Sequence, residues 1–413
     1  MNGIRKSLLK LVFSGAYMLR WNDRLRPVEL FELDKQGHKM IVAWLLWHCH
    51  AEKLPESEAS SLGLQVIEGA LFDYLYRLVI TDIKPPVFYR IKENKEHYRQ
   101  LTDFVLHELE PTVRPVGEAF WERMCAFFRN DGYHNVADDI LKAAHLYASN
   151  WEFQLIKAAN SFDEENPAID SNFQKSLRSF AALQGMPEIL EKDHALSRFA
   201  VFCGQLRFQI RWTQTPRVPA TSVLGHMFLV ACFSYFCSLR VGACTDRRIN
   251  NFFCGLFHDL PELLTRDIIS PVKRSVESLP GLIREYEEQE LERRIFSPLR
   301  VAGFSSLVDR LSYFLGLETG SEFFESVREN GRVRKLKNFE ELQEHYNCNG
   351  LDPKDGSLIK ACDLLAAFIE AHSSIRNGIT SAPLQEAVAR LRTDLRTNSA
   401  YALGFGTLLA DFD

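Results

Sequence analysis

The sequence lacks the paired cysteines of a disulfide framework. Its nine cysteines are an odd number, and they are scattered singly in apolar stretches such as Phe202-Cys203. Such cysteines are typical of reduced core residues, so we expect a cytoplasmic protein. The N-terminus also lacks a convincing signal peptide, because Lys10 interrupts its apolar run and no small-residue cleavage site follows. We expect an amphipathic first helix instead.

A strong charge of one sign is absent too. The formal net charge is −5 at pH 7, and basic residues are interleaved with acidic ones, which gives no sign of a nucleic-acid surface. Hydrophobic residues make up 46% and charged residues 25% of the 413 residues, which is typical of a globular protein with room for two or three domains. No membrane association is expected.

Alternating, strand-like runs are scarce, whereas apolar residues recur at helical spacing along the chain. This pattern predicts an all-α fold.

The most informative segment is LFHDLPELLTRD at residues 256–267. If residues 251–265 are helical, His258 and Asp259 lie about 100° apart and can converge on one ion, with Glu262 one turn further on the same side. A nitrogen and a hard oxygen ligand suit a divalent transition metal, but two ligands are too few. The segment points to a hydrolase that takes further ligands from elsewhere.

Two more candidate ligands lie in strongly apolar runs. His226 opens one predicted buried helix, and Asp363 lies inside another. Burying a carboxylate among apolar neighbours is costly unless a cation or hydrogen bonds compensate it, and a metal ion would do so. The expected metal ligands are His226, His258, Asp259 and Asp363.

The order of these residues resembles the H…HD…D ligand set of the HD-domain metal-dependent phosphohydrolases, and more narrowly the bacterial HD-domain 5'-deoxynucleotidases. The narrower resemblance is carried by Glu262 and Asp267, by Ser270-Pro271-Val272-Lys273, which is similar to a Thr-Pro-Val-Lys stretch of that group, and by the pair Arg211-Trp212. Gly225 departs from the pattern, since that group commonly has Glu before the first histidine.

The resemblance implies hydrolysis of a nucleoside 5'-monophosphate, preferably a deoxyribonucleotide, with one divalent ion that is Mn, Co, Fe, Ni or Zn. It implies that Glu262 orients or deprotonates the attacking water, or assists the leaving oxygen. Arg211 and Lys273 would neutralise the phosphate, Asp267 would bind the sugar 3'-hydroxyl, and Trp212 would crowd a 2'-hydroxyl.

Two alternatives stay open. The same site could act on another phosphate ester, as a dNTP triphosphohydrolase or a cyclic-nucleotide phosphodiesterase. The chain could also be a nucleotide-binding regulatory protein with negligible turnover, although a pure sensor has less need of Glu262 and Asp267.

The chain also contains an internal repeat, in which residues 71–87 align without gaps with residues 256–272. Other landmarks keep the same order, with Arg20-Trp21 matching Arg211-Trp212 and Gly37-His38 matching Gly225-His226. In the first copy the residues that replace His258, Asp259, Glu262 and Asp363 are Asp73, Tyr74, Arg77 and His145.

We therefore expect two tandem HD-like helical bundles. Residues 1–160 would be a degenerate, structural copy, 161–175 an acidic linker with a proline, and 176–413 the phosphohydrolase domain. The second copy is about thirty residues longer between its matched landmarks, which predicts an insertion around 317–355.

The first half could instead still hold an ion between His38, Asp73 and His145, but Arg77 and Tyr74 disfavour this. Because the single-domain enzymes that the chain resembles act as homodimers, the first half could serve as a built-in partner. The protein would then be a monomer with an internal pseudo-dimer, and a homodimer is the alternative.

Overall fold

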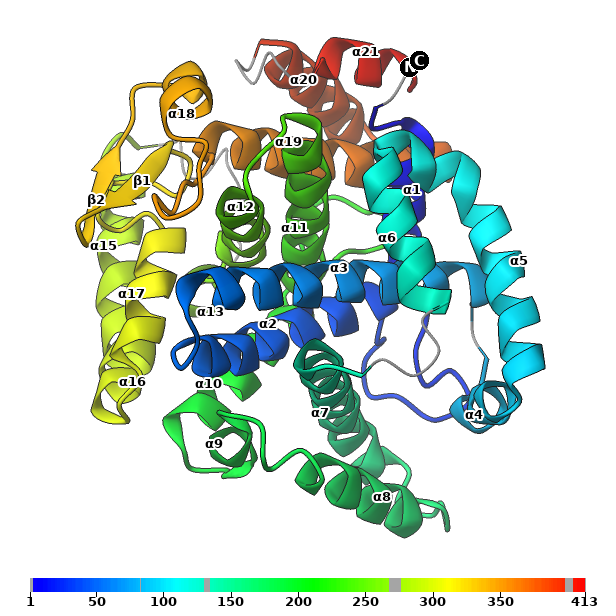
Figure 1. The fold of residues 1–413 in the computed structure, drawn as a ribbon. Coiled ribbons are helices and arrows are strands. Elements are labelled where there is room, and N and C mark those ends of the chain that lie inside the picture. The colour runs from blue at the N-terminus through cyan, green and yellow to red at the C-terminus, as the bar shows by residue number, and fades with distance from the viewer. Residues whose placement is uncertain (1–2, 82, 130–133, 267–275, 398–403, 413) are drawn as a thin grey trace.

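The computed structural model describes residues 3–81, 83–129, 134–266, 276–397 and 404–412 (Figure 1). Helices dominate these residues, which confirms the predicted all-α fold. The helices are α1 (Lys6–Phe13), α2 (Glu32–Ala51), α3 (Glu56–Ile80), α4 (Pro85–Glu93), α5 (Lys95–Val113), α6 (Glu118–Arg129), α7 (Val136–Ala159), α8 (Asn166–Arg178), α9 (Met186–Leu190), α10 (Ala195–Gly204), α11 (Val223–Arg240), α12 (Thr245–Phe257), α13 (Glu262–Thr265), α15 (Leu279–Leu291), α16 (Ser297–Val301), α17 (Ser305–Phe314), α18 (Phe339–His345), α19 (Gly356–Arg376), α20 (Ala382–Thr397) and α21 (Phe405–Ala410).

Four helices form the centre of the molecule. Figure 1 shows α2 and α3 running across α11 and α12, and α2 packs on α11 while α3 packs on α12. Helix α7 packs against α2 and α3, and α19 packs against α11 and α12. Helix α11 is long and apolar enough to cross a membrane, but 89% of it is buried inside the protein, as expected of a core helix.

One hydrophobic core continues across the two halves of the chain. Trp44 of α2 packs its ring against Phe253 and Phe257 of α12 and against Phe314 of α17, with ring centroids 4.8 to 6.3 Å apart. Aromatic contacts of this kind hold helices together, because each ring buries a large apolar area and makes favourable edge-to-face contacts. The division into bundles at 1–160 and 176–413 stays a prediction.

The N-terminal segment forms the amphipathic helix that its sequence predicts. Helix α1 buries Leu8, Leu9, Val12 and Phe13 and leaves Lys10 exposed. All nine cysteines are free, and most are buried.

The segment expected to be a linker is largely helical. Asn166–Arg178 forms α8, with Pro167 in its first turn, and α8 packs on α7. Proline is tolerated at that position because the first turn needs no N–H donor. The acidic and polar composition of the segment reflects an exposed helix more than an extended connection.

The predicted insertion around 317–355 contains the sheet of the described residues. Strands β1 (Ser326–Glu329) and β2 (Arg332–Lys335) form an antiparallel hairpin, and α18 follows it. Val327, Leu336 and Leu342 make a small core of their own. The scarcity of alternating runs did not predict this hairpin, because each strand has only four residues and contains a single valine among polar side chains.

A buried ion pair fixes the insertion to the helical core. Arg247 of α12 donates to Asp355 at 2.6 Å, both side chains are fully buried, and Arg247 also donates to Gln343 of α18. Asp355 in turn accepts the backbone N–H of Leu358 and caps the N-terminus of α19. The insertion therefore ends on the helix that carries Asp363.

Two loops, one before α2 and one before α11, share a backbone pattern. Leu19 bridges to Phe31 in the first loop, and Ile210 bridges to Ser222 in the second. Trp21 (φ 54°) and Trp212 (φ 59°) both adopt the left-handed conformation two residues after the start of the bridge.

This pattern corrects the expected match between His38 and His226. His226 lies four residues after Ser222, and the residue four after Phe31 is Lys35. His38 lies almost one turn further along α2, where its Nε2–H donates to the carbonyl of Ala200 at 2.9 Å. The shared Gly-His dipeptide produced the wrong match, because Gly37 and Gly225 lie at different turns of their helices.

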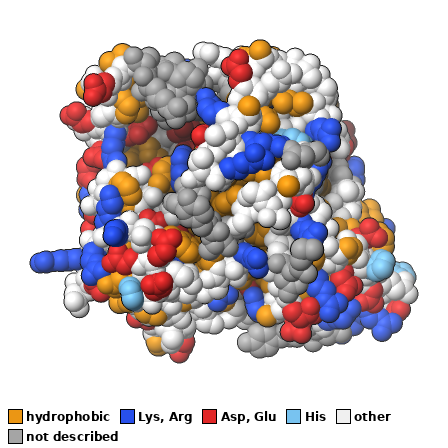
Figure 2. Space-filling view, turned by 90° about the horizontal axis from the view of Figure 1, so that it is seen from above, with side chains coloured by type: hydrophobic (Ala, Val, Ile, Leu, Met, Phe, Trp, Pro, Cys, Tyr) orange, Lys and Arg blue, Asp and Glu red, His pale blue; other side chains and the backbone are white. Residues whose placement is uncertain are grey.

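On the face shown in Figure 2, acidic and basic side chains are interspersed.

Candidate metal centre

The His-Asp pair lies where α12 ends, and the expected helix over 251–265 is interrupted there. Helix α12 stops at Phe257, residues 258–261 form turns, and α13 begins at Glu262. Pro261 explains the interruption, since it lacks an N–H and its ring conflicts with the carbonyl four residues earlier. His258 keeps helical backbone angles (φ −56°, ψ −36°), so the expected convergence of His258 and Asp259 is retained.

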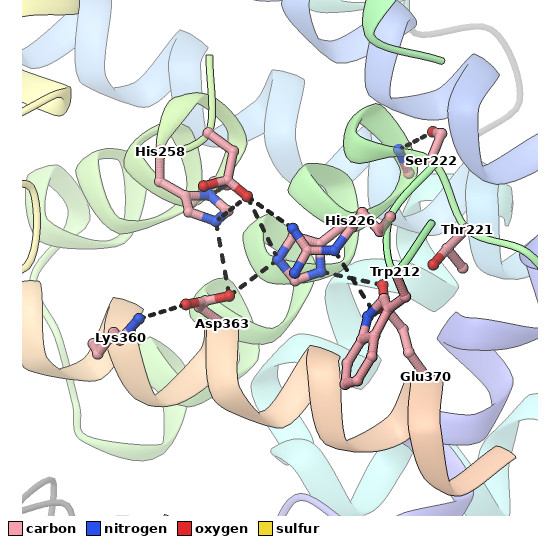
Figure 3. Close-up of polar contacts among 12 residues, drawn as sticks. Trp212, Thr221, Ser222, His226, His258, Lys360, Asp363 and Glu370 are labelled. Atoms are coloured by element: carbon pink, nitrogen blue, oxygen red, sulfur yellow. Dashed lines mark hydrogen bonds and ion pairs between the residues drawn. The ribbon is translucent and has the colours of Figure 1, made fainter. Parts of the chain in front are cut away.

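The four predicted ligands lie close together at this turn. Figure 3 shows His226, His258 and Asp363 facing one another. His226 Nε2 lies 3.1 Å from Asp363 Oδ1 and 3.9 Å from Asp259 Oδ2. His258 Nε2 lies 3.2 Å from Asp259 Oδ2 and 4.0 Å from Asp363 Oδ1. Ligand atoms bound at about 2.1 Å to one ion lie on the order of 3–4 Å apart, so the spacing suits a single metal ion.

The ligand atoms of His226, His258 and Asp259 all lie within 4.8 Å of one another. Asp363 lies outside this compact trio, although it approaches both histidines. Its Oδ2 accepts a hydrogen bond from Lys360 Nζ at 2.8 Å. Burial raises the pKa of Asp363, but the charges of Lys360, His226 and His258 outweigh burial and hold that pKa well below its usual range.

His258 points its Nε2 toward the carboxylates of the site. Its Nδ1–H donates to the carbonyl of Gly255 at 2.8 Å, which fixes the ring orientation and leaves Nε2 facing the carboxylates. Within the described residues this buried Nε2 makes no well-aligned hydrogen bond, although it lies 3.2 Å from Asp259 Oδ2. Burial lowers the pKa of His258, but Asp259 and Asp363 outweigh it and raise the pKa to about 9. Such a nitrogen, beside two carboxylates, fits a bound cation.

Glu370 orients the other histidine, and the sequence reasoning missed this role. Glu370 is fully buried, and His226 Nδ1–H donates to its Oε1 at 3.2 Å while Trp212 Nε1–H donates to its Oε2 at 3.0 Å. Burial raises the pKa of Glu370, but His226, Arg211 and Arg217 lower it strongly, so it is ionised. A carboxylate behind a ligand histidine fixes its tautomer and aims Nε2 at the metal.

The predicted repeat contains a signal for Glu370. Glu370 lies seven residues after Asp363, and Glu152 lies seven residues after His145. Glu152 is also fully buried and accepts from Trp21 Nε1 at 3.0 Å. An acidic residue kept at the same distance in both halves could have pointed to the position.

Arg211 and Trp212 lie beside the ligand cluster. Arg211 donates to Asp259 Oδ2 at 3.1 Å, and its Nε lies 3.7 Å from Glu370. The guanidinium of Arg217 stacks on the Trp212 ring, 5.5 Å from its centroid. Arg211 thus brings a permanent positive charge to the edge of the site.

Of the other predicted site residues, Glu262 lies within the described part of the chain. Glu262 is buried at the first position of α13, one turn after Asp259, whose carbonyl accepts its N–H at 3.1 Å. Asp267 and Lys273 lie outside the described residues. The insertion adds Phe323, whose ring centroid lies 6.3 Å from that of His258 and 4.4 Å from Lys360 Nζ.

One part of the chain is similar to a known protein family. Residues 203–392 match the family model described as HD domain. This range includes all four predicted ligands, Glu262 and Glu370. Comparisons with curated proteins and with solved structures gave no significant match.

Proposed function

Because residues 203–392 fall within the HD-domain superfamily, whose members are usually metal-dependent phosphohydrolases, we propose that the chain hydrolyses nucleoside 5'-monophosphates to nucleoside and phosphate. The observation that carries the proposal is the meeting of His226, His258 and Asp259 within 4.8 Å, with Arg211 bonded to Asp259. A cation site next to a guanidinium suits a phosphate ester, which needs both its charge neutralised and a water activated.

His226, His258, Asp259 and Asp363 would hold one divalent ion. Mn, Co, Fe, Ni and Zn all accept such nitrogen and oxygen ligands. When bound, the ion lowers the pKa of water and polarises a phosphoryl oxygen.

The protein side chains would position and protonate the substrate. Arg211 can bind phosphate oxygens in a bidentate fork while it stays next to Asp259. Glu262, one turn from the ligands, would orient the attacking water or pass a proton to the leaving 5'-oxygen. Trp212 would pack against the sugar. We also propose that Asp267 binds the 3'-hydroxyl and that Lys273 binds the phosphate.

We further propose that residues 1–160 are a degenerate copy that serves as an internal partner. Supporting observations are the packing of α2 on α11 and of α3 on α12, and the matched loops before α2 and α11. An internal copy would cover the apolar face that a second subunit covers in a homodimer. The protein would then act as a monomer.

The experiment is a phosphate-release screen of metal-loaded protein against all ribo- and deoxyribonucleoside 5'-monophosphates. We expect release from at least one deoxyribonucleotide, its loss in Asp259→Ala, and full activity in the exposed control Asp193→Ala. Equal release by wild type and Asp259→Ala would refute the proposed chemistry. Tripolyphosphate from a nucleoside triphosphate, or a linear product from a cyclic dinucleotide, would instead identify another HD-type substrate.

A further inference from the structure

Two lysines are buried at the place in the first half that corresponds to the metal centre. Lys35 and Lys39 of α2 are each 1% exposed and lie one turn apart, so their side chains share a face of the helix. Lys35 stands at the position that matches His226 by the loop pattern. Burying an ammonium group is expensive unless a counter-charge compensates it.

The described residues give these two ammonium groups little negative charge. Lys35 Nζ donates to His145 Nδ1 at 2.6 Å, and no carboxylate in the described part of the chain lies within ion-pair distance of it. Lys39 Nζ reaches Asp73 at 3.4 Å, and the Asp73 side chain is 47% exposed. This pairing is long and partly screened by water.

The buried carboxylates nearby are engaged by arginines. Glu32 and Glu152 each accept from Arg20 at 2.7 Å. Glu152 also accepts from Arg207 at 2.8 Å. These carboxylates therefore lie closer to guanidinium groups than to the lysines, and they stabilise mainly the arginines.

His145 completes a set of hydrogen-bond donors. The charge of Lys35, and then burial, lower the pKa of His145 well below its usual value, so its ring is neutral. Because Nδ1 accepts from Lys35, the ring proton is on Nε2, which becomes a donor. His145 is an exposed residue, so the group of donors is accessible from solvent.

We propose that Lys35, Lys39 and His145 form a binding site for a phosphate group, supplied as inorganic phosphate or as the phosphoryl group of a nucleotide. The amino groups of two lysines and an imidazole N–H together offer several hydrogen-bond donors to a small dianion, which also supplies the negative charge that these buried amino groups lack. Burial lowers the pKa of Lys35 well below its usual value, and a bound anion would favour the charged form of Lys35. The proposal stands on these contacts and does not depend on the activity proposed above.

The test measures phosphate binding away from the metal centre. We would use the full-length, metal-loaded chain with Arg211→Ala to weaken phosphate binding at the second half, and measure binding by equilibrium dialysis and by the shift in Tm. Phosphate should bind in one equivalent and raise Tm. Adding Lys35→Met and Lys39→Met should weaken binding at least tenfold and abolish the shift, whereas the exposed control Lys175→Met should change neither.

The unbranched methionine side chain is only one atom shorter than that of lysine, and replacing buried ionisable groups by apolar ones is often neutral or stabilising, so the double variant should fold. Lys39→Gln alone provides a second, milder variant and should also weaken binding. Unchanged phosphate binding in either variant would overturn the proposal.

Competition identifies the source of the phosphate group. Equal competition by phosphate and by deoxyadenosine 5'-monophosphate would show that the phosphate group alone is recognised, and tighter binding of the nucleotide would make a nucleotide the ligand. Equal competition by deoxyadenosine, which has no phosphate, would overturn the proposal.

Discussion

Glu370→Gln tests whether the carboxylate behind His226 tunes the metal centre. Glu370 accepts two hydrogen bonds, from His226 Nδ1 and from Trp212 Nε1, one on each oxygen. Glutamine keeps the shape but offers one oxygen and one NH₂, so it can accept from one of these donors while the other faces an N–H. One buried donor is left unsatisfied, and the negative charge that supports the basicity of His226 is lost.

The size of the effect follows from these two losses. An unsatisfied buried donor costs about 1–3 kcal/mol. Removing a carboxylate behind a ligand histidine lowers metal affinity by about 10–100-fold, which corresponds to about 1.4–2.8 kcal/mol. We therefore expect Glu370→Gln to weaken Mn²⁺ binding by one to two orders of magnitude, as measured by calorimetric titration of metal-free protein.

Glu152→Gln is the matched control. Glu152 is equally buried and also bonds a tryptophan, Trp21, but it lies in the first half next to no predicted ligand. It should lower stability and leave Mn²⁺ affinity within about twofold, because its neighbours are arginines. If Glu370→Gln binds Mn²⁺ as tightly as wild type, or if Glu152→Gln weakens binding as much, the positioning role of Glu370 is wrong.

Two further predictions concern stability. Burial, and then the charge of Arg207, lower the pKa of His38 to about 3, so the folded state holds His38 neutral and its stabilisation is complete above about pH 6.5 and is lost as pH falls toward 3. Between pH 7.5 and 5.5 this residue should cost about 1.4 kcal/mol of unfolding free energy, so urea titrations should find a loss over this range that is about 1.4 kcal/mol larger in wild type than in His38→Gln. Asp355→Ala should cost about 3–5 kcal/mol, because it leaves the fully buried Arg247 without its counter-charge. A loss no larger than that of the exposed control Asp193→Ala would contradict this assignment.

The proximity of the four candidate ligands could be predicted from the sequence. His226 and Asp363 were conspicuous because polar side chains in long apolar helical runs need a partner, and the structure places both beside His258 and Asp259. The all-α fold followed from the same helical periodicity. Both inferences depend on local pattern, which a single sequence contains.

Features that depend on three-dimensional context were harder to predict. The end of α12 at Phe257 is set by Pro261, which the periodicity alone overlooked. The role of Glu370 depends on contacts across more than a hundred residues. Lys35 could be matched with His226 only once the backbone bridges fixed the register of the two loops. The sequence alignment had chosen His38 because residue identity, and not geometry, guided it.

The most direct test of the metal centre is anomalous diffraction from crystals of Mn²⁺-loaded protein. The account predicts one manganese peak per chain, about 2.0–2.3 Å from side-chain atoms of His226, His258, Asp259 and Asp363. A peak between Asp73 and His145, or the absence of a peak among the four predicted ligands at saturating Mn²⁺, would contradict it.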